Sequence, residues 1–375
     1  MQLNVIDGSA KLFTSQRRTP SRYNLTKLAS DNFFLKSLSF KTLPGSIIIR
    51  RIVIVFTFAG NVFNLYLRSS MLFTLNDIKF KQVFDIFEQS IFCLCFIFIS
   101  SGPFHINLDN FYENFDSIWR RIIIAQGTVC ETFILSETKR INRELIVMLL
   151  LGTTMLLGFA LLGIFGKDEL WQASITFFAL AYTLYLNIGY IYILRLSVGL
   201  IKAGFQSIES RLETCSVTLA NLGHVRLCRQ SHNQIIQLID LLQTTFKHVF
   251  SAFICFFVPQ FVFGFYQLAV SSQTILINVV TIGWNSVNFY FVLILAEGLI
   301  LLNTLPQSYY LALYLTSFGD ISGLVKIEIN HYLNYVASKD VGFRLWGNFL
   351  VNNELIPKLC AVVFSYLTAG VSFLQ

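Results

Sequence analysis

Three side chains of types that bind metal ions recur at every fourth position of one stretch, namely His224, Cys228 and His232. Imidazole and thiolate groups are common zinc ligands, and a spacing of four places side chains on one face of a helix. Each step of four residues also rotates the side chain by about 40° around the helix axis, so the three groups converge poorly on one ion. We therefore expect a solvated or packed helix face here, and we predict neither a metal site nor a cofactor.

Two further charged features have the spacing or the setting of functional groups. Glu297 is an acid within a long apolar stretch, and a carboxylate inside a membrane is a functional candidate by default. Because Glu297 lies near the end of that stretch, its side chain could instead reach water, so a gating role and an interfacial role both remain open. Glu354 and Lys358 are one helical turn apart, and we expect them to form an ion pair that anchors the start of the last helix.

Aromatic residues with a few polar neighbours occur in several apolar segments, which is what a small-molecule pocket in a helical bundle requires. Trp284, Asn285 and Asn288 are the best group, because they lie within about one helical turn. For any single aromatic residue, core packing or an interfacial belt is the alternative. The full set of ligand-binding candidates is Glu88, Gln89, Tyr182, Tyr185, Gln260, Phe261, Tyr266, Trp284, Asn285 and Asn288.

Long apolar segments are the elements that must position these residues. The chain has 375 residues, of which 54% are hydrophobic and 13% are charged, and apolar runs of about 17 to 25 residues are long enough to cross a bilayer as helices. No nucleophile and base pair, glycine-rich phosphate loop or paired carboxylate site occurs in the sequence, so we predict that the protein is not an enzyme. We predict an all-α, seven-transmembrane protein with spans at 47–67, 82–101, 145–165, 172–197, 248–270, 277–302 and 354–375.

The distribution of positive charge predicts how the chain is threaded. Residues 1–51 contain nine Lys and Arg and two acids, and the predicted spans place 22 Lys and Arg on the side of the N-terminus against four on the opposite side. Because cytoplasmic loops carry the excess of Lys and Arg, we predict a cytoplasmic N-terminus and, after seven crossings, an extracellular C-terminus. The net charge of +7 is then explained by membrane orientation, and we predict no nucleic-acid partner.

The segments on the inner side are long and carry apolar residues at helical spacing. One stripe contains Leu212, Cys215, Leu219, Leu222, Ile235, Leu238, Leu242 and Phe246, and another contains Ile321, Val325, Ile329, Tyr332 and Val336. We expect the helices to continue into the cytoplasm and to pack there on one another as an anchor domain. Amphipathic helices lying on the membrane surface are the alternative.

The predicted organisation follows from these spans. It consists of a cytoplasmic N-terminal segment at 1–46, transmembrane helices one to six within 47–302 with the cytoplasmic extension 198–247, a cytoplasmic anchor region at 303–353, and a final transmembrane helix at 354–375.

The last residues resemble the end of the insect gustatory receptors, a family within the insect chemoreceptor superfamily. That family ends in Thr-Tyr, five hydrophobic residues and Gln-Phe. Here Ser365 and Tyr366 precede 367–371, followed by Ser372 and Phe373. Ser365 is a mild departure from the family pattern, whereas Ser372 in place of Gln changes the chemistry of the motif.

The resemblance implies a ligand-gated, non-selective cation channel in the plasma membrane of a sensory neuron. Four subunits, identical or related, would place their last helices around one pore, with Ala369, Ser372 and Phe373 at the gate and permeant cations passing between them. Small, weakly polar residues on one helix face suit a wet pore, although they also suit close helix packing. Leu367 stands where sugar-sensing members tend to have Glu, which favours bitter or other apolar small-molecule tastants.

Other functions remain as alternatives to the channel. A seven-span G-protein-coupled receptor would have an extracellular N-terminus, and neither Asp-Arg-Tyr nor Asn-Pro-x-x-Tyr occurs in the sequence. A transporter would be expected to contain internal repeats with polar sites near the bilayer midplane. Because of Ser372, a non-conducting auxiliary subunit of the same fold is a closer alternative.

Overall fold

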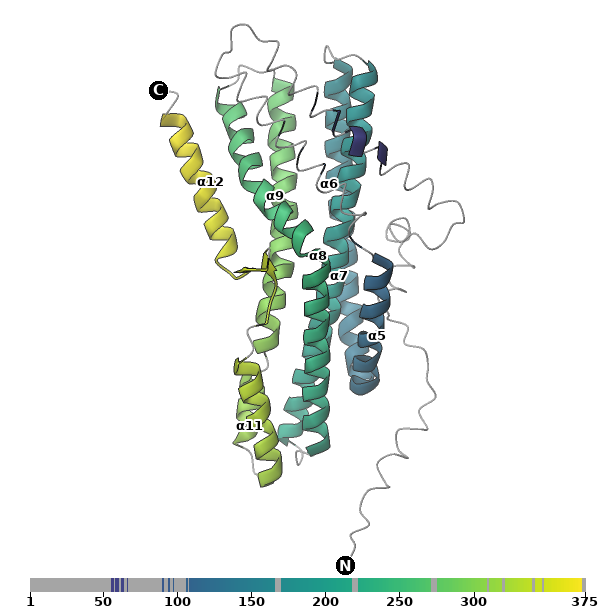
Figure 1. The fold of residues 1–375 in the computed structure, drawn as a ribbon, viewed down its shortest axis with the longest axis vertical. Helices are drawn as coiled ribbons and strands as arrows, with labels where there is room; N and C mark the ends of the chain where they lie inside the picture. Colours follow the sequence, from purple (N-terminus) through teal and green to yellow (C-terminus); the bar gives the residue numbers. More distant parts are fainter. Residues whose placement is uncertain are drawn as a thin grey trace, which may run out of the picture.

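A computed structural model of the chain describes residues 106, 108–165, 170–217, 222–270, 275–308, 310–318, 321–338, 341–345 and 347–372, with scattered positions between 55 and 97. The segment 1–46 and most of the expected spans 47–67 and 82–101 lie outside these residues. Long helices run side by side through the described part (Figure 1). They are α6 (Thr128–Phe165), α7 (Leu170–Val217), α8 (Leu222–Val270) and α9 (Ile275–Thr304), beside which stands the shorter α12 (Leu355–Ser372).

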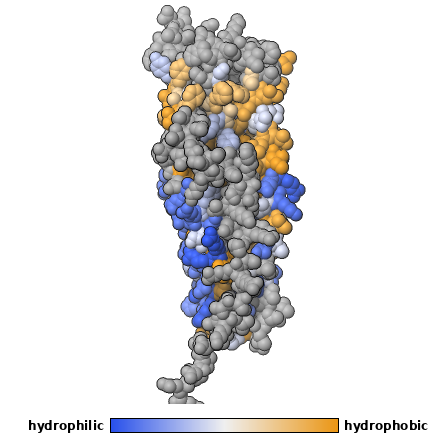
Figure 2. All heavy atoms as spheres, turned by 90° about the vertical axis from the view of Figure 1, so that its right-hand side faces the viewer, coloured by the Kyte–Doolittle hydropathy of each residue, from blue (hydrophilic) through white to orange (hydrophobic). Residues whose placement is uncertain are grey.

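Two of these helices are much longer than a membrane is thick. α7 contains 48 residues, which at 1.5 Å per residue gives about 72 Å, more than twice the roughly 30 Å of the hydrocarbon core. Residues 170–194 of α7 contain no acid, Lys or Arg, whereas the remainder of the helix is charged. Figure 2 shows the same division on one face, with hydrophobic residues gathered toward the upper end and hydrophilic residues below. Residues 198–217 and 222–247 of the expected extension thus belong to α7 and α8, while its cytoplasmic location remains a prediction.

Within the described residues, four helical segments are long and apolar enough to cross a membrane. They are Cys130–Gly158, Phe177–Glu213, Leu222–Val262 and Asn278–Ser317, and Leu355–Thr368 is a shorter apolar helix. The protein is thus an all-α, multi-pass membrane protein in this part of the chain. The total of seven spans and the direction of threading remain predictions.

The extensions of α7 and α8 pack on each other through a core of the kind found in water-soluble proteins. Leu212 of α7 and Ile235, Leu238 and Leu242 of α8 are fully buried. The predicted packing of this stripe is confirmed for these residues, while Cys215 and Leu219 lie where side chains are not described.

A helix on the side of α8 extends this core. α5 (Leu108–Gln126) places Phe111 in edge contact with Phe246 of α8, at a ring-centre distance of 5.1 Å, and buries Phe115 and Trp119 completely. Gly127 ends the helix with a positive φ of 67°, a conformation that glycine adopts without a steric penalty. The chain can therefore turn sharply from α5 into α6.

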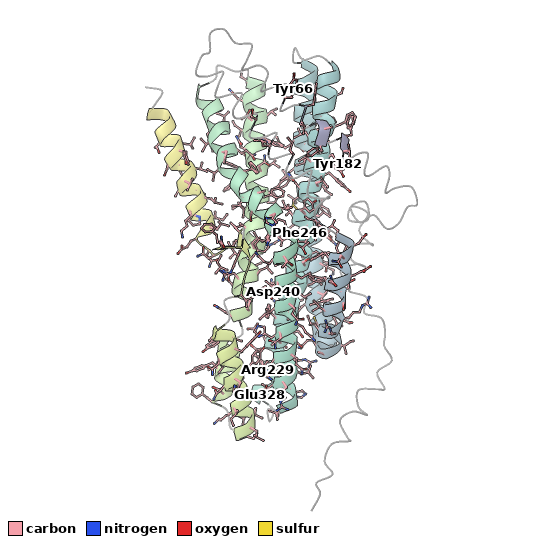
Figure 3. The ribbon with its side chains drawn as sticks, viewed as in Figure 1. Tyr66, Tyr182, Arg229, Asp240, Phe246 and Glu328 are labelled. Carbon is pink, nitrogen blue, oxygen red and sulfur yellow. The ribbon has the colours of Figure 1, made fainter. Side chains whose placement is uncertain are left out.

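Short elements follow the lower end of α9. They are η1 (Leu305–Gln307), α10 (Tyr310–Ser317) and α11 (Gly323–Ser338). Val325, Ile329, Tyr332 and Val336 of α11 are buried, which confirms the second predicted stripe. Arg229 of α8 and Glu328 of α11 form an ion pair at 3.1 Å near the lower end of the molecule (Figure 3).

A short β-hairpin joins α11 to α12, whereas the sequence analysis predicted no strands. Strands β1 (Arg344–Leu345) and β2 (Phe349–Leu350) pair antiparallel, with Gly347 at a φ of 84° in the turn. α12 then begins, and Lys358 Nζ lies 2.6 Å from Glu354 Oε2, so the expected ion pair at the start of this helix is present. Within the described ranges, the all-α description is correct apart from this hairpin.

The core around α5 gives a test of the fold. Phe115→Ala removes a fully buried ring, and emptying such a site costs about 3 to 5 kcal/mol of unfolding free energy. We expect a clear fall in the thermal unfolding midpoint of the purified protein in detergent. Ile124→Ala, at an exposed position of the same helix, is the matched control and should change the midpoint little. Equal effects of the two variants would contradict the packing of α5.

Candidate functional site

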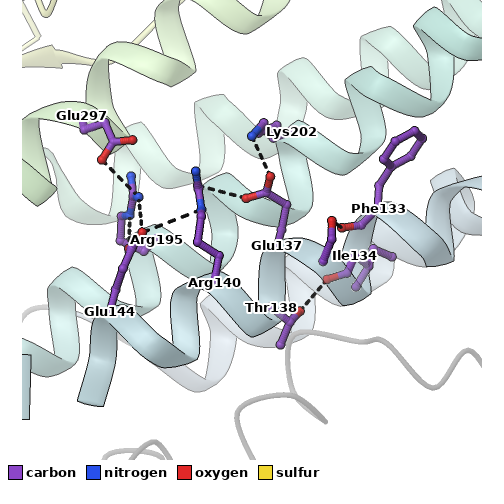
Figure 4. A network of polar contacts seen from close by, with 10 residues as sticks. Phe133, Ile134, Glu137, Thr138, Arg140, Glu144, Arg195, Lys202 and Glu297 are labelled. Atoms are coloured by element: carbon purple, nitrogen blue, oxygen red, sulfur yellow. Dashed lines mark hydrogen bonds and ion pairs between the residues drawn. The ribbon is translucent and has the colours of Figure 1, made fainter. Parts of the chain in front are cut away.

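Three helices are joined where their charge-free segments end. Glu144 is the last charged residue of α6, Arg195 the first of α7 and Glu297 the first of α9. The Arg195 guanidinium donates from Nε and Nη2 to the two Glu144 carboxylate oxygens, at 2.9 Å each. Nη2 also lies 3.2 Å from Glu297 Oε2 (Figure 4). One guanidinium thus bridges α6, α7 and α9.

A second group of charges lies about one to two turns before Glu144 on α6 and about two turns after Arg195 on α7. Arg140 pairs with Glu137 at 2.9 Å and approaches Glu144 at 3.7 Å, while Lys202 Nζ lies 2.6 Å from Glu137 Oε1. The two groups together contain three cations and three carboxylates, so the network is electrically balanced. Buried charges are tolerated when they are paired in this way, which explains how they can lie beside the apolar segments.

The network gives Glu297 a partner that the sequence analysis did not identify. Its side chain is 53% exposed, whereas that of Arg195 is 1% exposed, so the bridge has a buried centre and a more accessible edge. This position suits the interfacial interpretation of Glu297 and also makes it a link between helices. Its gating role stays a prediction. Arg195 was missed because a lone Arg at the end of an apolar segment gives no sign of which helices will surround it.

The residues of the predicted ligand group on α9 differ in their hydrogen bonding. Trp284 and Asn285 are buried, and Asn288 Nδ2 donates to the Trp284 carbonyl oxygen at 3.0 Å, within the same helix. The Asn285 amide lies against Gly264 of α8, where a Cβ atom would collide with it. Among the residues that the structure describes, neither amide atom of Asn285 has a hydrogen-bond partner, which leaves both atoms available to a polar group of a ligand.

The other ligand candidates are distributed over separate helices. Tyr182 and Tyr185 of α7 are partly buried and stack on each other at 6.3 Å, and Phe261 of α8 is buried. Gln260 is partly buried, and its Nε2 has no hydrogen-bond partner among the residues described. The side chain of Tyr266, together with Glu88 and Gln89, lies outside the described residues. The described candidates thus occupy α7, α8 and α9, and their assembly into one pocket remains a prediction.

Over the described part of α12, one face of the helix packs on the rest of its own chain. Leu359, Val363 and Leu367 follow one another at intervals of four and lie against a group on α8 and α9. That group consists of Val258, Phe261, Val262, Phe289 and Val292. Phe364, Ser365, Tyr366 and Thr368 lie on other sides of the helix and are exposed.

The predicted gate lies at the end of this helix. Ala369 and Ser372 belong to α12, but their side chains, and all of Phe373, lie outside what the structure describes. Their expected role therefore remains a prediction.

The possible metal ligands on α8 are arranged for packing. His224 is exposed, whereas Cys228 and His232 are buried. The His232 ring contacts Phe205 of α7 and Tyr332 and Tyr335 of α11, at ring-centre distances of 5.5 to 5.7 Å. The described residues contain no group of three or more His, Cys, Asp or Glu side chains placed to hold a metal ion. The imidazole of His232 instead helps to join three helices.

The Arg195 bridge can be tested by removing its charges one at a time. Arg195→Met leaves the Glu144 carboxylate partly buried without its main partner, so we expect a loss of about 3 to 5 kcal/mol in unfolding free energy. Glu297→Gln removes a mostly exposed partner and should cost less than about 1 kcal/mol. Thermal unfolding in detergent measures both. Adding Glu144→Gln to Arg195→Met should recover part of the loss, and simple additivity of the two changes would contradict a direct bridge.

Comparison with known proteins places this geometry in a known fold. No family model matches the sequence, and no curated protein matches it significantly. The structure of the insect olfactory receptor OR5 from Machilis hrabei in complex with eugenol matches with a TM-score of 0.72 and 11% identity, covering 93% of this chain and 97% of that one. Another structure of that receptor matches with a TM-score of 0.66 and 12% identity, covering 88% and 89%. The likeness shows that the chain has the helical fold of an insect olfactory receptor, whereas the gustatory family that the terminal motif suggests is not specifically shown.

Proposed function

We propose that the chain is a chemosensory receptor that acts as a subunit of a ligand-gated, non-selective cation channel in the plasma membrane. The observation that carries the proposal is the whole-length likeness to OR5, one of whose structures contains a small molecule, eugenol. The composition of the chain and its long apolar helices agree with such a receptor. The low identity leaves the kind of stimulus open, so the gustatory assignment rests on the C-terminal motif alone.

The arrangement of α12 supports a pore at its free face. Leu359, Val363 and Leu367 attach the helix to its own chain, which leaves other sides of α12 uncovered in a single subunit. In an assembly of four subunits, that uncovered surface would face neighbouring subunits and a central pore. Ala369, Ser372 and Phe373 would form its gate, with Ser372 contributing a ring of four hydroxyls where the family has amides. Hydroxyl groups can replace part of the hydration of a passing cation without binding it tightly.

An exposed apolar surface on α10 and α11 supports contact between subunits. Tyr310, Tyr314 and Phe318 form a continuous aromatic row, with ring centres 6.4 and 4.8 Å apart. Leu311 and Leu315 of α10, and Leu324 and Ile327 of α11, are also exposed in the single chain. Exposed apolar patches of this kind usually mark interaction sites. We propose that identical or related subunits cover it, which makes α10 and α11 part of the cytoplasmic anchor.

The ligand is proposed to bind among the aromatic and amide residues of the apolar half of the bundle. Trp284 offers a large apolar side chain, and Asn285 offers an amide that has no hydrogen-bond partner within the described part of the chain. Such a combination fixes the orientation of a small, mainly apolar molecule. Together with Leu367 in the terminal motif, it favours bitter or other apolar tastants. A non-conducting auxiliary subunit of the same fold is the alternative that Ser372 supports.

The pore assignment predicts which cysteine substitutions will be accessible to a charged reagent. A positively charged methanethiosulfonate should reduce the current of Ser372→Cys, because this reagent attaches a cation inside the pore. Val363→Cys, on the face that packs against α8 and α9, is the matched control and should be unaffected, as should the wild-type chain with its native cysteines. Whole-cell currents evoked by eugenol provide the measurement. Equal modification of both variants would refute the proposed orientation of α12.

The ligand proposal predicts a separation between response and folding. Trp284→Ala should raise the eugenol concentration that gives half-maximal current at least about tenfold. The reason is that a buried aromatic contact is worth about 1.5 kcal/mol or more. Surface biotinylation should show normal amounts of the variant at the plasma membrane. Phe178→Ala, at an exposed position of α7, serves as the control. A parallel loss of surface protein would assign Trp284 a structural role instead.

A further inference from the structure

The hairpin between α11 and α12 is a small unit that needs support from its surroundings. The Val351 N–H donates to the Phe343 carbonyl oxygen at 2.9 Å, which closes the hairpin beyond its two paired positions. A two-stranded hairpin alone is at best marginally stable in water. The position of this hairpin must therefore be fixed by the elements packed around it.

On one side, a glutamine of α8 takes the place of a third strand. Gln243 Nε2 donates to the Arg344 carbonyl oxygen at 2.7 Å, and the Arg344 N–H donates to Gln243 Oε1 at 2.7 Å. This exchange of two hydrogen bonds is the pattern by which paired residues of antiparallel strands are joined. The Phe343 ring, fully buried, adds a contact with Phe250 of the same helix at 5.9 Å.

On the other side, an asparagine of α9 holds the end of the hairpin. Asn303 Nδ2 donates to the Val351 carbonyl oxygen at 2.9 Å, and Val351 is fully buried. Gly342 approaches the Asn303 side chain so closely that a Cβ atom would collide with its oxygen. Thus α8 and α9 each hold the hairpin through one amide side chain.

This attachment fixes where α12 begins. Three residues separate Val351 from Leu355, the first residue of α12, and the Glu354 N–H donates to Asn352 Oδ1 at 3.1 Å within that link. Above this root, much of the described part of α12 is exposed. A shift of α8 against α9 would therefore move the hairpin and, through three residues, the base of α12.

We infer that Gln243 and Asn303 are positioning residues that transmit movements of α8 and α9 through the hairpin 341–351 to α12. The inference rests on the proposed channel function, because transmission to α12 opens or closes a pore only if α12 lines one. It assigns to this junction the coupling between the ligand-binding half of the bundle and the gate.

The first experiment measures the positioning itself without requiring conduction. Hydrogen exchange of the purified full-length protein is compared between wild type, Gln243→Met and the matched control Gln237→Met, an exposed glutamine of the same helix. Gln243→Met keeps the length of the side chain and removes both hydrogen bonds. We expect faster exchange in 343–358 for Gln243→Met alone, with 223–237 unchanged. Unchanged exchange in 343–358 would overturn the inference.

The second experiment measures transmission. Basal and eugenol-evoked currents are recorded at matched surface expression, and eugenol binding is measured on the same variants. We expect Gln243→Met to change the ratio of open to closed channels about fivefold or more while the eugenol dissociation constant stays within about twofold. Gln243→Glu keeps the acceptor for the Arg344 N–H, so its ratio of open to closed channels should lie between those of wild type and Gln243→Met. This variant also provides the test if the methionine variant fails to fold.

The outcomes separate the two proposals. Conducting variants that gate like wild type despite faster exchange would overturn the transmission. A wild-type chain that conducts neither alone nor with eugenol or a panel of bitter and other apolar tastants, but shows the predicted exchange, would refute the channel proposal and leave the positioning of α12 by Gln243 supported.

Discussion

Charge is excluded from the hydrocarbon of a membrane, and this constraint sets the plan of the whole bundle. The apolar halves of α6, α7 and α9 end at Glu144, Arg195 and Glu297, and these three side chains meet in one bridge. Because the charges pair with one another, the helices can continue beyond the apolar region without separating. Their extensions then pack through buried residues such as Leu212 and Leu242, as in a water-soluble protein.

Features that depend on local spacing could be predicted from the sequence. The stripe that contains Ile329, and the ion pair of Glu354 with Lys358, both follow from the period of the helix. The charge bridge could not be predicted in the same way, because Glu144 and Glu297 lie far apart in the chain and meet Arg195 only through the register of three helices. The hairpin was missed for a related reason, since Gln243 supports it from a distant helix.

Three features of the structure support the functional interpretation. They are the apolar half of the bundle, the packed extensions of α7 and α8, and the free side of α12. The likeness to OR5 shows the fold, and the free side of α12 is the observation that supports the proposed pore. The helix is rooted by the hairpin and held to α8 and α9 along one stripe, so it is free to contribute its remaining surface to an assembly. The exposed aromatic row on α10 gives such an assembly a second place of contact, away from the apolar half of the bundle.

The central claim is that several copies of this chain surround one pore with α12. The most direct measurement is a cryo-electron microscopy structure of the full-length protein in lipid nanodiscs. The account predicts four chains related by a fourfold axis, with the side of α12 that contains Ser365 turned toward that axis and α10 and α11 in contact between neighbours. A monomer, or an assembly in which that side of α12 faces lipid, would contradict it.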